Sequence, residues 1–393
     1  MTDPTTDVDC EWVHIQFDEN PAFTETYGFS GSQGAVHLEG IRMRSRGVAS
    51  RTLLVFMHPA STLQLLPLPR HLAAIGFHVL CAGSRYARND TAAILEKVLL
   101  DLGAYIRHAR TVWGYDHVVL AGWSGGGSLA LFYQSQAERP TITATPAGDP
   151  VDIVGAGLIP ADAVIFQAAH LSRARMLAEM IDPSVVDEAD PDRRTLELDI
   201  YDPRNPNRPP YSADFLAEFR AAQLRRVRRI TAGVEERLAD LRRRGTGELE
   251  RGLLTHRTMA DPRFLDLTID PNGRPPNWCY MGRPETVNNG PVGLARFSTL
   301  RAWLSQWSID HSRMDGEACA AAISVPLLTI ENQADDVVPQ PHTGIVHRVA
   351  GSRDKTFAVI DGANHYYAGQ PRQMTEASDL VRRWLEQRGF GGA

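Results

Sequence analysis

Cysteine is scarce in this sequence of 393 residues, and the four that it has are far apart. They are Cys10, Cys81, Cys279 and Cys319. Their spacing matches neither a zinc site nor the disulfide framework of a small secreted protein. We therefore expect no metal site and a reducing compartment.

An excess of positive charge and a long apolar run are also missing. The formal net charge is −6, which gives no electrostatic case for binding nucleic acid or an anionic membrane surface. No apolar stretch approaches the roughly 18 residues that span a bilayer. The N-terminus is acidic and polar, unlike a signal peptide. We expect a cytoplasmic protein without a membrane span and without a nucleic-acid partner.

The segments that are present predict an α/β protein. Alternating residues at 11–17 and 34–45 flank a glycine-rich connection, Gly28 to Gly34, and predict an antiparallel pair at a sheet edge. The continuous apolar run at 52–57 is typical of a strand that is covered on both faces. Further strands are expected at 77–81, 117–120, 162–167, 325–330 and 356–360. Helical segments separate them, so we expect a mostly parallel central sheet.

One of these helices is long and amphipathic. Its apolar residues recur at helical spacing from Thr91 to Trp113. Asp90, directly before it, is the expected N-cap because its carboxylate can accept a first-turn N–H.

The alternation of strands and helices is interrupted between residues 170 and 319. Helical periodicity appears at 172–181, at 213–244 and at 292–306. About 150 residues are too many for a loop, so we expect a helical cap. The expected domains are a core at 1–169 and 320–393 and a cap insertion at 170–319. Acidic residues interleave the arginines of 220–244, which predicts a solvated or intersubunit face and leaves a homodimer through the cap as an option.

The most informative motif is Gly122-Trp-Ser-Gly-Gly126. It follows the strand expected at 117–120 and precedes residues with helical periodicity. A sharp strand-to-helix turn strains the serine backbone and lifts its hydroxyl above the sheet. The pentapeptide alone could be an ordinary glycine-rich turn. In this setting it predicts that Ser124 is a nucleophile.

Carboxylates and an imidazole follow two later strands. Asp335 and Asp336 come after the strand at 325–330, and His365 comes after the strand at 356–360. The carboxyl ends of parallel strands meet at one edge, where ligands bind in open α/β sheets. A serine hydroxyl needs a base to take its proton, and a carboxylate orients that base.

With these motifs, in the order Ser, Asp, His, the chain resembles the α/β-hydrolase superfamily. The resemblance covers roughly residues 50–170 and 320–390 and implies a serine hydrolase whose central sheet carries a large helical cap. In similar proteins the acid lies three residues after a turn position just past the strand. That position is Asn332 here, so the resemblance assigns the acid to Asp335 and leaves Asp336 as a helix cap or surface charge.

Acyl transfer also requires an oxyanion hole with two N–H donors. The amide of Gly125, directly after the nucleophile, is expected to be one of them. The other usually comes from the loop after the third strand, where many family members have His-Gly. This chain has His58-Pro59-Ala60 there, and proline carries no N–H. We therefore expect the second donor to be the amide of Ala60.

Several aromatic and histidine side chains are candidates for the substrate pocket. The candidates are His58, Trp123, His170, Trp303 and Tyr366. Each also has a structural alternative, in which it packs the cap against the core or meets solvent.

The predicted reaction is hydrolysis of a small hydrophobic or aromatic carboxylic ester. Ser124 attacks the carbonyl, His365 takes its proton, and Asp335 holds the imidazole. Water then hydrolyses the acyl-enzyme, with no metal or organic cofactor. Two alternatives stay open: the same triad acting on an amide, lactone, thioester or carbon–carbon bond, and a non-catalytic binding protein of this fold.

Overall fold

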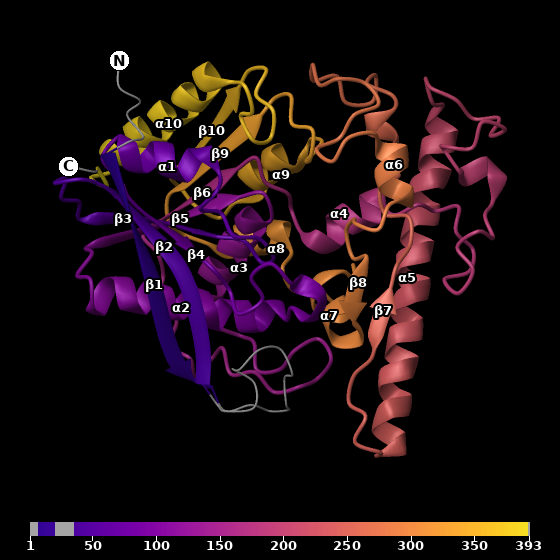
Figure 1. Cartoon of the computed structure of the whole chain (residues 1–393), viewed down its shortest axis with the longest axis horizontal. Coiled ribbons are helices and arrows are strands. Elements are labelled where there is room, and N and C mark those ends of the chain that lie inside the picture. The colour runs from indigo at the N-terminus through magenta and orange to yellow at the C-terminus, as the bar shows by residue number, and fades with distance from the viewer. Residues whose placement is uncertain (1–6, 20–34, 392–393) are drawn as a thin grey trace.

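The chain folds around a mostly parallel sheet, which contains eight strands in the part of the chain that is described (Figure 1). This computed structural model describes residues 7–19 and 35–391. The strand order is β1-β2-β4-β3-β5-β6-β9-β10. The bounds are β1 Val8–Asp18, β2 Ala35–Ser45, β3 Thr52–Met57, β4 His78–Ala82, β5 His117–Trp123, β6 Ala163–Gln167, β9 Leu327–Asn332 and β10 Lys355–Ile360.

The expected antiparallel pair lies at one edge of this sheet. β1 pairs with β2, and β2 pairs antiparallel with β4, whereas the neighbouring pairs from β4 to β10 are parallel. The glycine-rich connection from Gly28 to Gly34 falls outside the described residues. The predicted fold class, an α/β fold with a mostly parallel central sheet, is confirmed.

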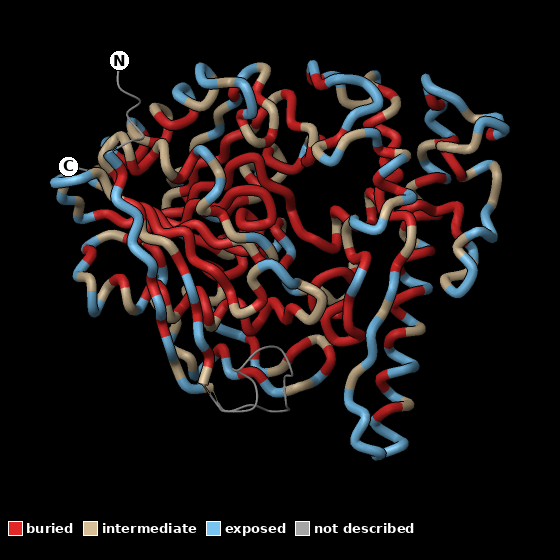
Figure 2. Tube along the Cα trace, viewed as in Figure 1, coloured by how far each residue is buried: buried red, intermediate tan, exposed pale blue. Residues whose placement is uncertain are grey.

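Helices cover both faces of the sheet. One face carries α1 (Pro67–Ala74) and α10 (Pro371–Glu386), and the other carries α2 (Leu95–Thr111), α3 (Gly125–Glu138), α8 (Gly316–Ala322) and α9 (His342–Val349). Successive residues of β3 alternate between these two cores: Leu53 and Val55 pack on the α2 side, and Leu54 and Phe56 on the α1 side. A strand buried on both faces needs apolar residues at every position, and Figure 2 shows the buried centre that results.

Helix α2 begins later than the sequence predicts. Residues Asp90–Ala92 form a separate 3-10 turn, η2, and α2 starts at Leu95. The Leu95 amide donates to Oγ of Ser305 at 2.8 Å, and that hydroxyl donates to Glu96 at 2.8 Å. The expected N-cap was wrong because the capping hydroxyl comes from a residue far along the chain, while Asp90 pairs with Arg173.

The segment between β6 and β9 combines helices, short strands and irregular stretches. Its elements before α8 are α4 Arg173–Met180, η3 Leu196–Leu198, α5 Ala213–Arg244, β7 Gly252–Leu254, η4 Pro262–Phe264, α6 Pro284–Asn289, β8 Phe297–Thr299 and α7 Leu300–Gln306. The long helix α5 has the predicted bounds and runs along the right-hand side of the molecule in Figure 1.

The helix predicted at 292–306 is only half correct. Phe297–Thr299 forms β8, which pairs antiparallel with β7, and α7 occupies Leu300–Gln306. Oγ1 of Thr299 accepts the Ala302 N–H at 3.2 Å, so the helix starts at this N-cap. The spacing of apolar residues at 292–298 therefore predicted a helix where the structure has none.

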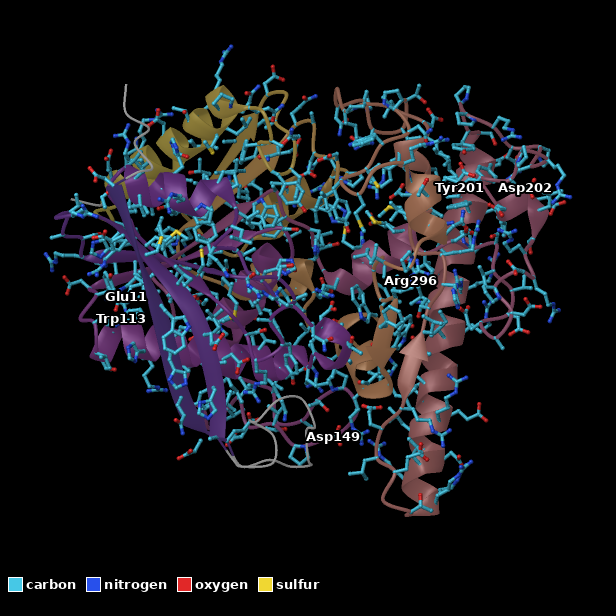
Figure 3. All side chains as sticks on the ribbon, in the orientation of Figure 1. Glu11, Trp113, Asp149, Tyr201, Asp202 and Arg296 are labelled. Carbon is cyan, nitrogen blue, oxygen red and sulfur yellow. The ribbon has the colours of Figure 1, made fainter. Side chains whose placement is uncertain are left out.

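Polar contacts attach α7 to segments between the strands of the sheet. Arg301 pairs with Asp149 at 2.7 Å, and Asp149 is labelled in Figure 3. Gln306 donates to the Asp90 carbonyl at 2.9 Å. Because ion pairs of this kind pay a desolvation cost, they fix geometry more than they add stability. Within residues 7–19 and 35–391, every helix is too short or too polar to span a bilayer.

Candidate active site

Ser124 occupies a strained turn between β5 and α3. Its backbone has φ 55° and ψ −128°, a region that is costly for a residue other than glycine. A Cβ on Gly122 would lie 2.6 Å from Cα of Gly127, so the turn closes only when residue 122 is glycine. This is the strand-turn-helix arrangement that the motif predicts.

Asp335 and His365 lie in the loops that follow the neighbouring strands β9 and β10. Nδ1 of His365 is 2.9 Å from Oδ2 and 3.0 Å from Oδ1 of Asp335. The same carboxylate accepts the backbone N–H groups of Val337 and Val338, each at 2.8 Å. A carboxylate on Nδ1 holds the proton there and leaves Nε2 free to act as a base.

Asp336 has a different position from Asp335. Its Oδ1 accepts the backbone N–H of His365 at 3.3 Å and does not meet the imidazole. Burial raises the pKa of Asp336. Asp335, which lies three residues after Asn332, therefore contacts the His365 imidazole, and Asp336 does not.

Aromatic rings enclose the His365 imidazole. The ring centroids of Trp123 and Tyr366 lie 4.4 Å and 4.8 Å from it. The Trp123 indole N–H donates to the His365 carbonyl at 3.3 Å. Nε2 of His365 is buried and has no hydrogen-bond partner in the described part of the chain. Trp123 directly precedes Ser124, so the imidazole lies beside the strained turn.

Three strand ends are tied together by residues that the sequence analysis did not single out as functional. The Gln167 amide donates to the Tyr367 hydroxyl at 2.6 Å, and that hydroxyl donates to Oδ1 of Asn332 at 2.8 Å. Nδ2 of Asn332 donates to the Asn364 carbonyl at 2.8 Å. This chain of bonds fixes the loops that carry Asp335 and His365. The sequence signal that could have found these residues is a polar side chain at the end of an apolar strand, as at Gln167 and Asn332.

The two expected oxyanion donors differ in this structure. Gly125 opens α3, so its N–H is a first-turn amide without an intrahelical acceptor. The Ala60 N–H, in contrast, donates to Nδ1 of His58 at 3.1 Å. The loop is held this way because the Pro59 carbonyl accepts the Ser84 hydroxyl at 3.2 Å. The prediction for Ala60 is therefore corrected: its amide is directed to the His58 ring.

His58 and His170 lie near His365 as neutral imidazoles. Burial lowers the pKa of His58 to about 3, helped by the charges of Arg173 and His365. Burial also lowers the pKa of His170 far below its usual value, and His342 and His58 add to this. Nδ1 of His170 is buried and unpartnered among the described residues. Their contact with substrate stays a prediction.

These histidines should make the protein sensitive to acid. Their folded pKa values lie below the value of about 6.5 in the unfolded chain, so the unfolded state binds more protons as pH falls. The stabilisation is complete above pH 6.5 and is lost below it. For His58, which is partly exposed, we expect a loss of about 2 kcal/mol at pH 4.5.

Urea unfolding at pH 7 and pH 4.5 measures this effect. The free energy of unfolding of the H58N variant should fall less than that of the wild type between the two pH values. Equal falls in both proteins would contradict the assignment of His58 as a neutral group in the folded state.

The structure separates the aromatic pocket candidates. Trp123 and Tyr366 contact the His365 ring. Trp303 is fully buried in the core between α7 and α5, where its indole N–H donates to Thr231 at 2.9 Å. The prediction that Trp303 lines the substrate pocket is corrected, because its ring and its N–H are both used in packing.

Arg173 is a charged residue near these histidines that the sequence analysis missed. It is 7% exposed, and its guanidinium lies 4.2 Å from the Trp307 ring centroid while it pairs with Asp90. Its Nε is buried without a hydrogen-bond partner in the described residues. No local motif could have marked it, because both partners are distant in sequence.

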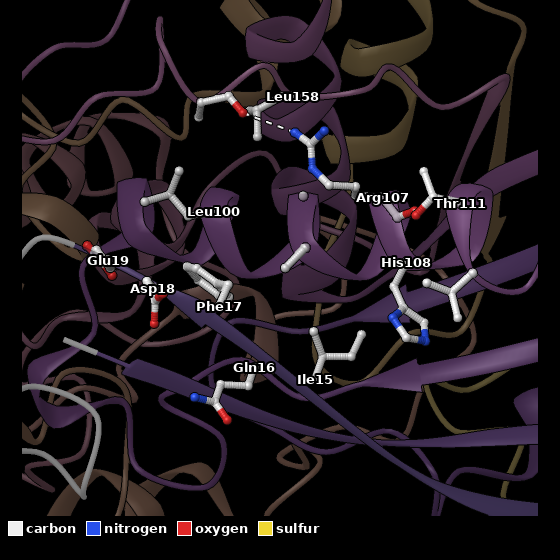
Figure 4. Close-up of a pocket in the computed structure, with 14 residues that line it drawn as sticks. Ile15, Gln16, Phe17, Asp18, Glu19, Leu100, Arg107, His108, Thr111 and Leu158 are labelled. Carbon is white, nitrogen blue, oxygen red and sulfur yellow. Dashed lines mark hydrogen bonds between the residues drawn. The ribbon is translucent and has the colours of Figure 1, made fainter. Parts of the chain in front are cut away.

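A cavity of about 370 Å³ lies away from these residues, between β1 and α2 (Figure 4). Phe17, Leu100, Arg107 and His108 are among the residues that line it. Arg107 donates to the carbonyls of Ala156 and Gly157, at 3.1 Å and 2.8 Å. None of the predicted catalytic residues borders this cavity.

Comparison with known proteins finds similarity in structure and not in sequence. No family model and no curated protein sequence matches the chain. One similar solved structure is DcsB in complex with its substrate analogue, at 13% identity and a TM-score of 0.48, covering 96% of this chain and 99% of that one. A monoacylglycerol lipase of Paleococcus ferrophilus has 14% identity and a TM-score of 0.45, with 88% and 98% covered. Brefeldin A esterase, a bacterial homologue of human hormone sensitive lipase, has 14% identity and a TM-score of 0.45, with 98% and 77% covered.

A lipase and an esterase are thus among the solved structures that this chain is similar to. At identities of 13% and 14% and TM-scores of 0.45 to 0.48, these similarities carry no conclusion about what this chain does. The chemistry of this chain is therefore inferred from the geometry of Ser124, His365 and Asp335.

Proposed function

We propose that this protein is a serine hydrolase that cleaves carboxylic esters with Ser124, His365 and Asp335. The observation that carries the proposal is the His365 imidazole. Its Nδ1 is held by Asp335, and its Nε2, next to the strained serine turn, is buried without a hydrogen-bond partner among residues 7–19 and 35–391. A buried imidazole nitrogen without a partner calls for an explanation, and a role as the base for Ser124 supplies one.

The proposed reaction has two halves. Ser124 attacks the ester carbonyl while Nε2 of His365 takes the hydroxyl proton, and Asp335 stabilises the imidazolium that forms. The same histidine then gives the proton to the leaving alcohol. In the second half, His365 takes a proton from a water molecule that attacks the acyl carbonyl, and it returns this proton to Oγ of Ser124 as the bond to the acyl group breaks.

We propose that residues 170–319 act as a cap that shapes the substrate pocket. Apolar residues of α4 and of the loop that carries Asp335 form one buried cluster, which Tyr280 and Tyr366 join from its edge. Met176, Met180, Val337 and Val338 belong to it. Because apolar side chains from the insertion pack against the loop that carries Asp335, the cluster supports a position of the insertion next to the catalytic residues. The Trp123 and Tyr366 rings beside His365 support a hydrophobic or aromatic ester as substrate.

A substrate panel tests this proposal. p-Nitrophenyl esters of increasing acyl length should be hydrolysed, with kcat/KM rising with acyl length until the pocket is filled. Matched anilides and lactones, assayed at the same concentrations, serve as the comparison. Faster cleavage of the anilides or lactones than of every ester would assign the same triad to a different bond.

A further inference from the structure

We propose that the His58 side chain supplies the second oxyanion donor, with Nε2–H of its imidazole acting beside the Gly125 amide. This inference rests on the proposed function of Ser124. It replaces the backbone amide of Ala60, which is directed elsewhere, with a side-chain donor from the same loop.

The hydrogen bonds of His58 fix which ring nitrogen carries the proton. Its Nδ1 lies 3.1 Å from the backbone nitrogen of Ala60 and 3.1 Å from that of Ser61. Both of these groups are N–H donors, so Nδ1 must act as an acceptor. A neutral imidazole that accepts at Nδ1 has its proton on Nε2. Nε2 is therefore a donor.

The His58 donor lies against the residue that follows the nucleophile. A Cβ on Gly125 would be 2.7 Å from Nε2 of His58 and 3.2 Å from Cδ2. Cβ and the amide nitrogen are both bonded to Cα, so Nε2 is within roughly 6 Å of the Gly125 nitrogen. One oxygen that accepts two bonds of about 2.9 Å can lie between donors up to roughly 6 Å apart. A single oxyanion can therefore be shared by the two groups.

The environment suits a neutral donor. The low pKa of His58, caused first by burial and then by the charge of Arg173, keeps the ring neutral around pH 7. It donates a hydrogen bond to the developing oxyanion and keeps its proton, so the proton transfers stay with Ser124 and His365. Preformed donors of this kind stabilise the transition state because they need no reorientation during the reaction.

Two substitutions at residue 58 separate donation from loop support. In H58N, the amide oxygen can take the place of Nδ1 and hold the Ala60 and Ser61 amides, but its NH₂ is too short to replace Nε2. In H58Q, the NH₂ reaches the position of Nε2, while the oxygen does not replace Nδ1. We expect H58N to lower kcat by about 100- to 1,000-fold with little change in KM, and H58Q to recover about ten-fold of that loss.

The opposite order would overturn the inference. If His58 only supported the loop, H58N would be the more active variant and H58Q the less active one. Unfolding midpoints of both variants show whether each is folded under the assay conditions. Labelling by a fluorophosphonate probe distinguishes a failure of the proposed function from a failure of the inference about His58. An unlabelled wild type overturns both. A labelled wild type with unchanged kcat in H58N overturns the inference alone.

Gly125 offers an independent variant. In G125A, the new Cβ would meet Nε2 at 2.7 Å and displace the His58 ring, while the amide at position 125 remains. We expect G125A to lower kcat, and the H58N/G125A double variant to lie within about three-fold of the slower single variant, because both remove one donor. If the two fold-losses in kcat multiply in the double variant, the two substitutions do not remove the same donor, which would contradict the inference.

Discussion

Replacing Ser124 with alanine should lower kcat for ester hydrolysis by about a million-fold, the loss seen when the nucleophile of a serine triad is removed. The reason is that Ser124 supplies the hydroxyl of the turn between β5 and α3, directly after Trp123, whose ring contacts the His365 imidazole. Residual hydrolysis would come from substrate binding and oxyanion stabilisation alone. Steady-state assays with the best p-nitrophenyl ester of the panel measure the change.

The S124G variant is a matched control for this result. The φ of 55° at residue 124 strains any residue that has a Cβ, so glycine should raise the free energy of unfolding by about 1 kcal/mol relative to alanine. Both variants should be inactive. An S124A or S124G protein that retains more than a few per cent of wild-type kcat would contradict the assignment of the nucleophile.

Replacing Asp335 with asparagine should lower kcat by about 10,000-fold. The two carboxylate oxygens lie 2.9 Å and 3.0 Å from Nδ1 of His365 and hold the proton on that nitrogen. An asparagine amide can instead donate to Nδ1, which moves the ring proton to Nε2 and removes the base. Initial rates at several pH values measure this loss.

Asp336 gives a matched control for Asp335, because the two acids are adjacent and only one meets the ring. Its carboxylate touches the backbone N–H of His365 at 3.3 Å, so D336N should cost no more than about ten-fold in kcat. Equal losses in D335N and D336N would mean that the orientation of the imidazole depends on the whole loop and not on Asp335.

Much of the core fold could be predicted because its signals are local. Both faces of β3 are buried, which requires a continuous apolar run. The helix α5 begins after the N-cap Ser212 and ends at Gly245, which are both local signals. The start of α2 could not be predicted, since the capping hydroxyl of Ser305 arrives from α7. The strand β8 was missed for a similar reason: its partner, β7, lies more than 40 residues earlier.

The candidate site divides in the same way. Ser124, Asp335 and His365 follow strands whose order along the sheet brings their loops together. Strand ends were enough to select Ser124, His365 and the pair Asp335–Asp336, and the spacing from Asn332 in the family resemblance then chose Asp335. The donor role of Ala60 failed because a side chain, that of His58, turned back onto its own loop and took the amide. The burial of Trp303 depends on Thr231 of α5, a contact that neither local sequence contains.

Covalent labelling of Ser124 tests the central claim most directly. The wild-type protein is incubated with a fluorophosphonate, and its intact mass and peptide map are measured beside those of S124A. The account predicts a mass increase of one adduct, located on the peptide that contains Ser124, and no adduct on S124A. An unlabelled wild type, or an adduct that persists in S124A, would contradict it.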